Sequence, residues 1–253
     1  MIYWDRPTLK ERAKNVLRNS YWMSFLVMFI FGILGGRFNF NFHVDAGDYN
    51  YFAYIGSPAE FWQQFSYGMQ AIMASAFTFV AIGAGAVGIL FKVFVTNVFE
   101  VGKCRFFTLS RYASINIEEL IFGFKHGKYL DNVKTMFLKN LYVFLWSLLF
   151  IIPGIIKGLA YFMVPYIIAE NPNISTERAL EISEKTTQGE KWDIFVLGLS
   201  FIGWYMLGIL ACGLGVLFVN PYSEATYAEL YGALRLKAVQ TGIATKDEIG
   251  AEL

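Results

Sequence analysis

Apolar residues in this chain gather in long runs that polar segments separate. The runs cover residues 21–36, 70–99, 141–169 and 192–234. Lipid offers the backbone no hydrogen-bond partners, so a spanning segment must be a helix or a strand of a closed barrel. Barrel strands alternate in hydropathy over about 10 residues, whereas these runs are continuous. The pattern predicts an all-α, polytopic transmembrane helical bundle that forms a single membrane domain over residues 1–253.

Two of the runs are longer than one span of about 20 residues needs. The run at residues 141–169 is interrupted by Pro153 and Gly154, and proline inside a helix removes a hydrogen bond and clashes with the preceding turn. Either this run is one long kinked span, or it is a hairpin in which residues 136–152 lead out and 155–169 return. The run at 192–234 raises the same question, with a candidate turn at Gly213–Gly215.

The distribution of lysine and arginine favours the hairpins, because these residues accumulate in cytoplasmic segments near span ends. With both hairpins the bundle has six spans, and both termini are cytoplasmic. The segments that are then inside carry 18 of the 21 cations: residues 1–20, 100–139, 170–192 and those after 234. In the four-span alternative, residues 170–192 lie outside with their three cations. Six spans therefore fit the charge pattern better.

The segments between the spans differ in charge and in their pattern of polar and apolar residues. Residues 1–20 are basic and amphipathic, which predicts a helix at the inner leaflet. Residues 100–139 and 170–192 are polar and read as cytoplasmic segments with interfacial helices. Residues 37–68 begin with apolar and polar residues in alternation, a strand signal. We expect an outer loop there and leave two forms open, a small β-hairpin or an irregular aromatic loop on the headgroups.

Composition excludes several classes of function. The chain is 56% hydrophobic and 16% charged, with a formal net charge of +1, so its partner is the lipid bilayer and not nucleic acid. Two histidines and two cysteines lie far apart, whereas a zinc site needs about four ligands. Phosphate-binding, dinucleotide-binding, zinc-protease and nucleophile-elbow motifs are missing from the sequence. We therefore expect no metal, no cofactor and no catalytic residues.

Polar residues inside the predicted spans are the candidate functional positions, since charge at bilayer depth costs at least about 2.5 kcal/mol. Glu224 lies near the middle of the last predicted span, and we expect it to pair with Lys92 or to line a polar cavity. The candidate intramembrane polar site comprises Lys92, Asn97, Asn220, Tyr222 and Glu224.

Four residues are expected to break or turn helices: Pro153, Gly154, Pro165 and Pro221. Broken helices near mid-membrane mark substrate or ion sites in transporters. Pro153 and Gly154 fall where the predicted hairpin turns, so a structural role is expected of them. Pro165 and Pro221 lie deeper and are expected to kink their helices.

Three stretches resemble a known family: LWSLLFIIPGIIKGLAYFMVPYIIAENPNIS, EISEKTTQGEKWDIFVLGLSFIGW and NPYSEATYAELY, together with the N-terminal RAKNVLRNSYW. They are similar to domain-of-unknown-function family 975, multi-pass membrane proteins mostly of Gram-positive bacteria. The resemblance covers nearly the whole chain except residues 37–68. It implies a bacterial plasma-membrane location and no mechanism. The IIPGI pattern is more weakly similar to membrane domains attached to some bacterial glycerophosphodiesterases, which supports a membrane domain and not that chemistry.

Three functions remain open on the sequence. The first is a non-enzymatic membrane protein with a structural, regulatory or partner-binding role. The second is a transporter of a small solute, lipid or ion, with a polar path through Glu224, Asn220, Lys92 and Asn97. The third is a membrane enzyme that acts on lipid headgroups, which requires His126, Asp131 or the acids of 170–193 to converge.

Overall fold

The computed structural model describes residues 4–34, 58–112, 115–125, 127–210 and 215–250. The chain divides into two compact units, one of residues 1–37 with 93–253, and one of residues 38–92. Each unit is described by itself.

Every described element is helical, which confirms the all-α prediction. The second unit contains α2 (Pro58–Phe91), and a π-helix, Lys92–Thr96, begins at its end. The predicted β-hairpin falls largely on residues 37–57, outside the described residues, and residues 58–68 are helical within α2. The first unit contains α1 (Arg6–Leu34), α3 (Asn97–Leu109), a 3-10 helix (Ile117–Ile121), α4 (Phe122–Lys125), α5 (Tyr129–Leu149), α6 (Ile151–Ala160), α7 (Val164–Glu170), α8 (Thr176–Thr186), α9 (Lys191–Leu199), α10 (Ile202–Leu210) and α11 (Gly215–Gln240).

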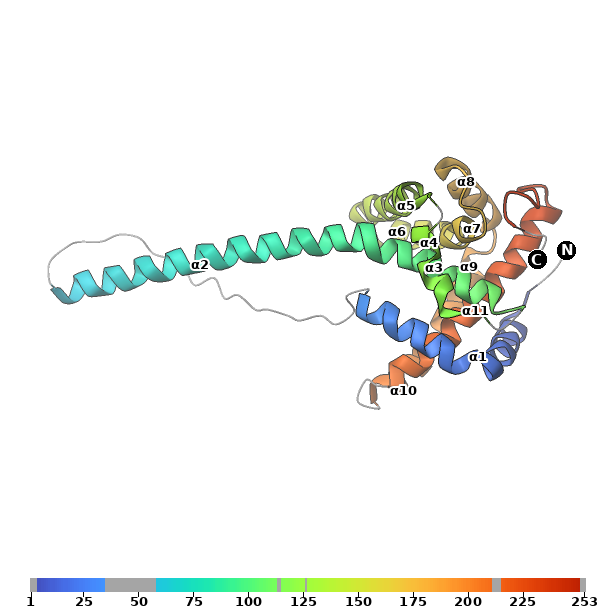
Figure 1. Ribbon diagram of the computed structural model, residues 1–253, viewed down its shortest axis with the longest axis horizontal. Helices are drawn as coiled ribbons and strands as arrows, with labels where there is room; N and C mark the ends of the chain where they lie inside the picture. Colours follow the sequence, from blue (N-terminus) through green and yellow to red (C-terminus); the bar gives the residue numbers. More distant parts are fainter. Residues whose placement is uncertain (1–3, 35–57, 113–114, 126, 211–214, 251–253) are drawn as a thin grey trace. The chain divides into compact units, whose positions relative to one another are not determined.

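Helix α1 carries the predicted amphipathic segment and the first apolar run without a break. Its first turn is capped by Asp5, whose carboxylate accepts a hydrogen bond from the Thr8 amide at 3.2 Å. The apolar positions Leu9, Ala13 and Leu17 are buried in the protein core. Helix α1 packs along α11, as Figure 1 shows. The apolar face that Leu9, Ala13 and Leu17 form on α1 is therefore covered by protein.

Helices α5 and α6 form the first predicted hairpin. The chain reverses at Phe150, whose extended backbone (φ −156°, ψ 149°) ends α5 and caps α6. Gly154 then faces Ser147, and a Cβ added at Gly154 would lie 2.7 Å from the Ser147 Cα. The hairpin interpretation is thus confirmed, but its turn at Pro153-Gly154 was wrong. Pro153 sits in the first turn of α6, where its missing N–H leaves no hydrogen bond unmade.

Helices α10 and α11 form the second hairpin. Gly208 and Gly215 bring the two backbones together, since a Cβ added at Gly215 would lie 2.6 Å from the Gly208 Cα. Farther along, the hydroxyls of Tyr205 and Ser223 are 2.9 Å apart. Residues 211–214 of the expected turn lie outside the described part of the chain, and Gly215 is already the first residue of α11.

The two deeper prolines act differently. Before Pro165 the chain leaves the helical path at residues 161–163, and Pro165 lies in the first turn of α7. Here the predicted interruption is confirmed. Pro221 lies inside α11, which remains an unbroken helix from Gly215 to Gln240. The helix is therefore not interrupted at Pro221, and the kink expected there stays a prediction.

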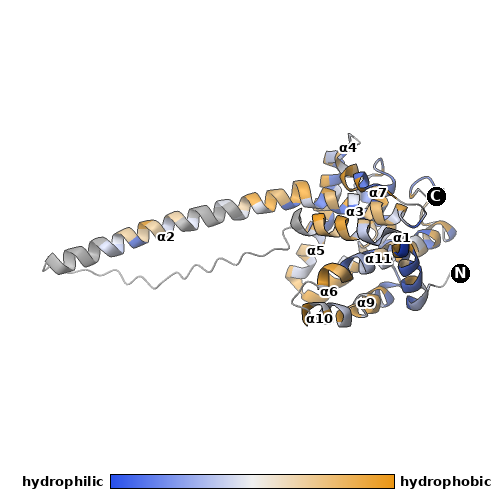
Figure 2. Ribbon diagram, turned by 60° about the horizontal axis from the view of Figure 1, so that its bottom comes forward, coloured by the Kyte–Doolittle hydropathy of each residue, from blue (hydrophilic) through white to orange (hydrophobic). Residues whose placement is uncertain are grey.

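Three stretches of the described chain are long and apolar enough to cross a membrane, Gly85–Leu109, Ile151–Glu170 and Lys191–Leu210. Large apolar side chains are exposed at the ends of both hairpins, such as Ile151 (77% exposed) and Leu210 (80% exposed). Figure 2 shows this apolar character along α6 and α10. Exposing apolar surface to water costs a free energy of about 25 cal/mol per Å², whereas exposing it to lipid does not. These features indicate a membrane location.

Candidate functional site

The candidate site is built on one face of α3. Glu100, Lys103 and Cys104 are three and four residues apart, so their side chains lie on the same side of the helix. The sequence predicted that the span over residues 70–99 ends at Phe99. In the structure, α3 continues the helical path beyond that residue to Leu109. The continuation buries Val101, Phe106 and Phe107 in the core. The three polar side chains of α3 are thereby held among packed helices, not in a polar segment.

Lys103 is the cation that pairs with Glu224. Its ammonium lies 2.8 Å from the Glu224 carboxylate, and the two side chains are 9% and 17% exposed. The same ammonium lies 4.7 Å from the centre of the Phe31 ring on α1, a cation–π distance. Glu224 was expected to pair with Lys92 or to line a polar cavity. Its partner is Lys103 instead of Lys92, because the helix continues past Phe99 and carries Lys103 to Glu224.

A second ion pair lies beside the first. The ammonium of Lys139, on α5, is 3.2 Å from the Glu100 carboxylate, and its side chain is 13% exposed. One helical turn before Glu100, the Asn97 side-chain oxygen accepts a hydrogen bond of 3.2 Å from the Asn140 amide. These two contacts fasten α5 to α3, and together the two ion pairs place two acidic and two basic groups around one end of α3.

The four charged side chains line a cavity of about 400 Å³. We call it the charged cavity and define its charged wall as Glu100, Lys103, Lys139 and Glu224. The rest of the lining is mostly apolar or aromatic and comes largely from α6, α7, α9 and the loop between α6 and α7. The remaining lining residues are Cys104, Gly158, Leu159, Phe162, Pro165, Tyr166, Ile194, Phe195, Gly198, Leu199 and Tyr227.

The structure brings together only part of the predicted polar site. Glu224 lines the charged cavity, and Asn97 is buried one turn from it on α3. Asn220 is buried in α11, whereas Tyr222 packs its ring against Phe201 at 5.4 Å and does not line the cavity. Lys92 is the last residue of the second unit and is described only within it. Among the predicted residues, Glu224 is the one that lines the charged cavity, and the continuous path of the transport hypothesis stays a prediction.

Lys103, Lys139 and Glu100 are functional candidates that the sequence interpretation missed. It assigned residues 100–139 to a polar cytoplasmic segment because cations accumulate there. A signal was nevertheless present, since Val98, Val101 and Phe106 continue the helical spacing of apolar residues past Phe99. Lys139 had no such signal, because only tertiary packing carries it to α3.

A second buried polar cluster joins α7 to α11. The Glu170 carboxylate accepts hydrogen bonds from the Tyr231 hydroxyl and the Arg235 guanidinium. The other side of that guanidinium donates to the Tyr112 hydroxyl at 2.8 Å. The side chains of Glu170 and Arg235 are only 4% and 3% exposed. Because each partner compensates the other's charge, the cluster fixes the register of the two helices.

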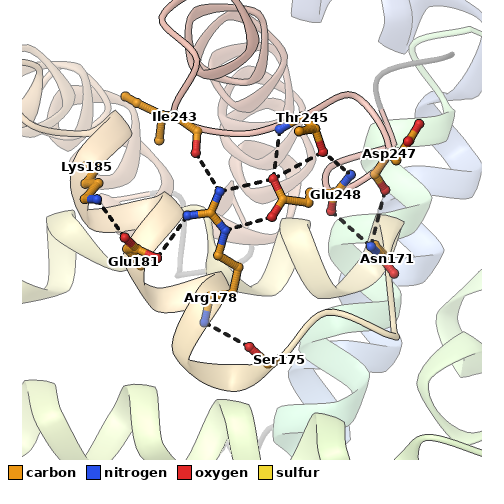
Figure 3. Close-up of polar contacts among 9 residues, drawn as sticks. All are labelled: Asn171, Ser175, Arg178, Glu181, Lys185, Ile243, Thr245, Asp247 and Glu248. Atoms are coloured by element: carbon orange, nitrogen blue, oxygen red, sulfur yellow. Dashed lines mark hydrogen bonds and ion pairs between the residues drawn. The ribbon is translucent and has the colours of Figure 1, made fainter.

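A third cluster fastens the C-terminal segment to α8 (Figure 3). The Arg178 guanidinium donates to both oxygens of Glu248, at 2.7 and 3.1 Å, and to the Ile243 carbonyl at 2.9 Å. The predicted helix at 170–192 is α8, and the Ser175 hydroxyl caps it by accepting from the Arg178 amide. The hydrogen bonds from Arg178 and Thr245 lower the pKa of Glu248 to about 2, and the acidic partners raise the pKa of Arg178.

The described residues contain no group of three or more His, Cys, Asp or Glu side chains that could hold a metal ion. His126 lies outside the described residues. Asp131 is exposed and lies 3.7 Å from the Lys128 ammonium. Convergence of His126, Asp131 or the acids of 170–193, which the enzyme hypothesis requires, stays a prediction.

Three apolar stretches long enough to cross a membrane, in an all-helical fold, indicate a helical membrane protein. The family model described as "Protein of unknown function (DUF975)" matches residues 148–238, so this part of the chain is a domain of that family. The match confirms the resemblance over α6 to α11 and does not include the N-terminal RAKNVLRNSYW stretch. No curated protein and no solved structure matches the chain.

Proposed function

We propose that the chain is a multi-pass protein of the bacterial plasma membrane that acts by binding and not by catalysis. It has six spans, with two hairpins and both termini in the cytoplasm. The family description names no activity, so the proposal depends on the charges and the packing.

The observation that carries this proposal is the pairing of buried charges across helices. Glu224 pairs with Lys103, Glu229 with Arg111, and Glu170 with Arg235. Removing one partner of such a pair leaves an uncompensated charge, which costs about 3–5 kcal/mol. Acids held in this way lock α3, α7 and α11 together. That arrangement favours a rigid structural or partner-binding protein over an enzyme, whose acid or base must exchange protons with a substrate.

The topology is supported by the apolar ends of the hairpins. Both ends expose large apolar side chains, which suits insertion in the bilayer. The connection between the hairpins, with α8, carries Arg178, Lys185 and Lys191, as expected of a cytoplasmic segment. A polar connection on the same side as both termini is what six spans require.

A transporter of a small solute, lipid or ion is the second candidate, and the charged cavity favours it. A transported molecule needs a site that opens in turn to each side of the membrane. In a binding protein, the cavity does not open to water on the two sides of the membrane in turn. Transport would require the Lys103–Glu224 pair to be exposed to water on both sides at different times.

Cys104 lines the cavity and is buried, so it reports on these alternatives without an added residue. The test uses membrane vesicles of both orientations, a Cys212→Ser background and a membrane-impermeant maleimide. The proposed binding role predicts that Cys104 reacts in neither orientation under native conditions and reacts after denaturation. Reaction from both aqueous sides would overturn it in favour of transport.

A further inference from the structure

The lining of the charged cavity combines two kinds of side chain. Part of it is formed by the Lys103–Glu224 and Lys139–Glu100 pairs, at 2.8 and 3.2 Å. Another part is formed by apolar side chains of α6 and α9, among them Leu159, Ile194 and Leu199. The volume of about 400 Å³ has room for far more than one water molecule, whose share of liquid volume is about 30 Å³. The walls thus match a molecule that is itself part polar and part apolar.

The balance of charge limits what the polar side accepts. The charged wall holds two acids and two bases, so it is neutral as a whole. A ligand with a net charge would take one partner from a pair and leave the other unpaired in a poorly hydrated site, which is costly. A zwitterion avoids this penalty, because its cation replaces a lysine at a glutamate while its anion takes the released lysine.

Aromatic rings line the cavity close to the charged wall. The Phe162 ring lies 5.5 Å from the Tyr166 ring and 5.7 Å from the Tyr227 ring, measured between ring centres. All three residues line the cavity. Aromatic faces attract ammonium groups, and the attraction increases where water is excluded. The cationic end of a zwitterion therefore has suitable neighbours in addition to the glutamates.

The position of Leu199 indicates the direction of entry. This side chain lines the cavity and is also 43% exposed, so it joins the cavity lining to the surface of the protein. Leu199 belongs to Lys191–Leu210, one of the stretches apolar enough to cross a membrane. An opening in such a stretch faces hydrocarbon, which suits a molecule with an apolar tail better than a water-soluble solute.

We propose that the charged cavity binds a zwitterionic amphiphile, with an ammonium and a phosphate in its headgroup and an apolar tail. The ammonium lies against Glu224 or Glu100 and the aromatic rings, and the phosphate lies against Lys103 or Lys139. The tail leaves the cavity past Leu199. This inference rests on the proposed binding role and names the ligand class of that role.

The experiment uses the full chain in a mild detergent and measures binding by native mass spectrometry. The probes are lysophosphatidylethanolamine, the anionic lysophosphatidylglycerol, and phosphoethanolamine, which is the zwitterionic headgroup without a tail. The proposal expects the zwitterionic lysolipid to bind at least about tenfold more tightly than either other probe. Equal binding of both lysolipids would overturn the selection by charge, and equal binding of phosphoethanolamine would overturn the need for a tail.

Two variants locate the bound lysolipid. Leu199→Trp narrows the opening, and Leu207→Trp is its control, since Leu207 is exposed on α10 and does not line the cavity. Leu199→Trp is expected to weaken binding about tenfold, and Leu207→Trp to leave it unchanged. Equal binding by these two variants would place the lysolipid elsewhere and overturn the inference.

A pair of double variants tests the charged wall. Glu100→Gln with Lys139→Met removes one cavity ion pair and leaves no lone charge. Glu184→Gln with Lys157→Met removes an ion pair of 2.6 Å outside the cavity and is the control. Only the first is expected to weaken binding about tenfold, and equal effects of the two would overturn the role of the wall. If no probe binds while Cys104 stays protected from both sides, this inference fails and the proposed binding role stands. If Cys104 reacts from both sides while the zwitterionic lysolipid still binds selectively, the proposed binding role fails and the assignment of the ligand class stands.

Discussion

The ammonium of Lys103 and the carboxylate of Glu224 lie 2.8 Å apart and join α3 to α11. Helices α1, α5 and α7 also pack against α3. The pair therefore lies where several helices meet, and water reaches it poorly. In such a place an ion pair adds little net stability compared with apolar residues, but a lone charge is strongly unfavourable.

Removing one member of this pair should destabilise the protein more than removing both. Lys103→Met is expected to lower the free energy of unfolding by about 3–5 kcal/mol, because Glu224 is left without its cation. Lys103→Met with Glu224→Gln should recover much of that loss. Thermal unfolding in detergent, followed by circular dichroism, measures the difference.

The control is Lys185→Met, whose exposed pair with Glu181 contributes about 0.3–0.5 kcal/mol. If Lys103→Met behaved like this control, the pair would not be buried in the folded protein.

Close packing at the first hairpin gives a prediction with a matched control. A Cβ at Gly154 would lie 2.7 Å from the Ser147 Cα. Backbone atoms in a packed hairpin cannot move far enough to relieve such a contact. Gly154→Ala should therefore destabilise the protein by about 1–3 kcal/mol. A Cβ at Gly158 would meet only the Val143 side chain, at 3.9 Å, an ordinary contact. Gly158→Ala should leave the unfolding temperature unchanged or raised, since alanine favours the helix. The same unfolding temperature in both variants would mean that α5 and α6 are not paired as described.

Acid should release the C-terminal segment from α8. The pKa of Glu248 is lowered from its usual 4.5 to about 2 by the hydrogen bonds from Arg178 and Thr245. A folded-state pKa below the unfolded value means that the stabilisation is present above about pH 4.5 and disappears as the pH falls through about 2. Both side chains are about one-third exposed, so solvent screening keeps the contribution within about 1 kcal/mol.

Hydrogen exchange of residues 241–250 as a function of pH measures this release. Protection should persist from neutral pH to about pH 4 and fall below it. Glu248→Gln should remove the pH dependence and lower the protection at neutral pH. Protection in the wild type that does not change between pH 6 and about pH 2 would show that the Arg178–Glu248 contact does not hold the segment.

The sequence predicted the helical hairpins because their physical causes are local. Apolar runs too long for one span, with a proline and glycines within them, require a reversal. The first turn was nevertheless misplaced. Proline is well suited to the first turn of a helix, so Pro153 marks the start of α6 and not the reversal itself at Phe150. The interruption before Pro165 follows the same rule.

The charged cavity was less predictable, because its partners come from distant parts of the chain. Glu224 stood out as an acid in an apolar run, but its partner depended on where the preceding helix ended. Lys103 and Lys139 had been grouped with solvated cations, and hydropathy alone does not distinguish a solvated lysine from one paired in a core. Pairing is decided by helix packing, which one sequence does not reveal.

The measurement that tests the account most directly is the side of the membrane on which residue 188 lies. Gln188 is exposed between α8 and α9, and Lys246 is exposed near the C-terminus. Single cysteines at Gln188, Lys246 and Asp48, in a Cys212→Ser background, are labelled in intact cells with a membrane-impermeant maleimide. Six spans predict that Asp48→Cys reacts, while Gln188→Cys and Lys246→Cys react only after the cells are permeabilised. Labelling of Gln188→Cys in intact cells, with Lys246→Cys protected, would contradict the two membrane hairpins and support four spans.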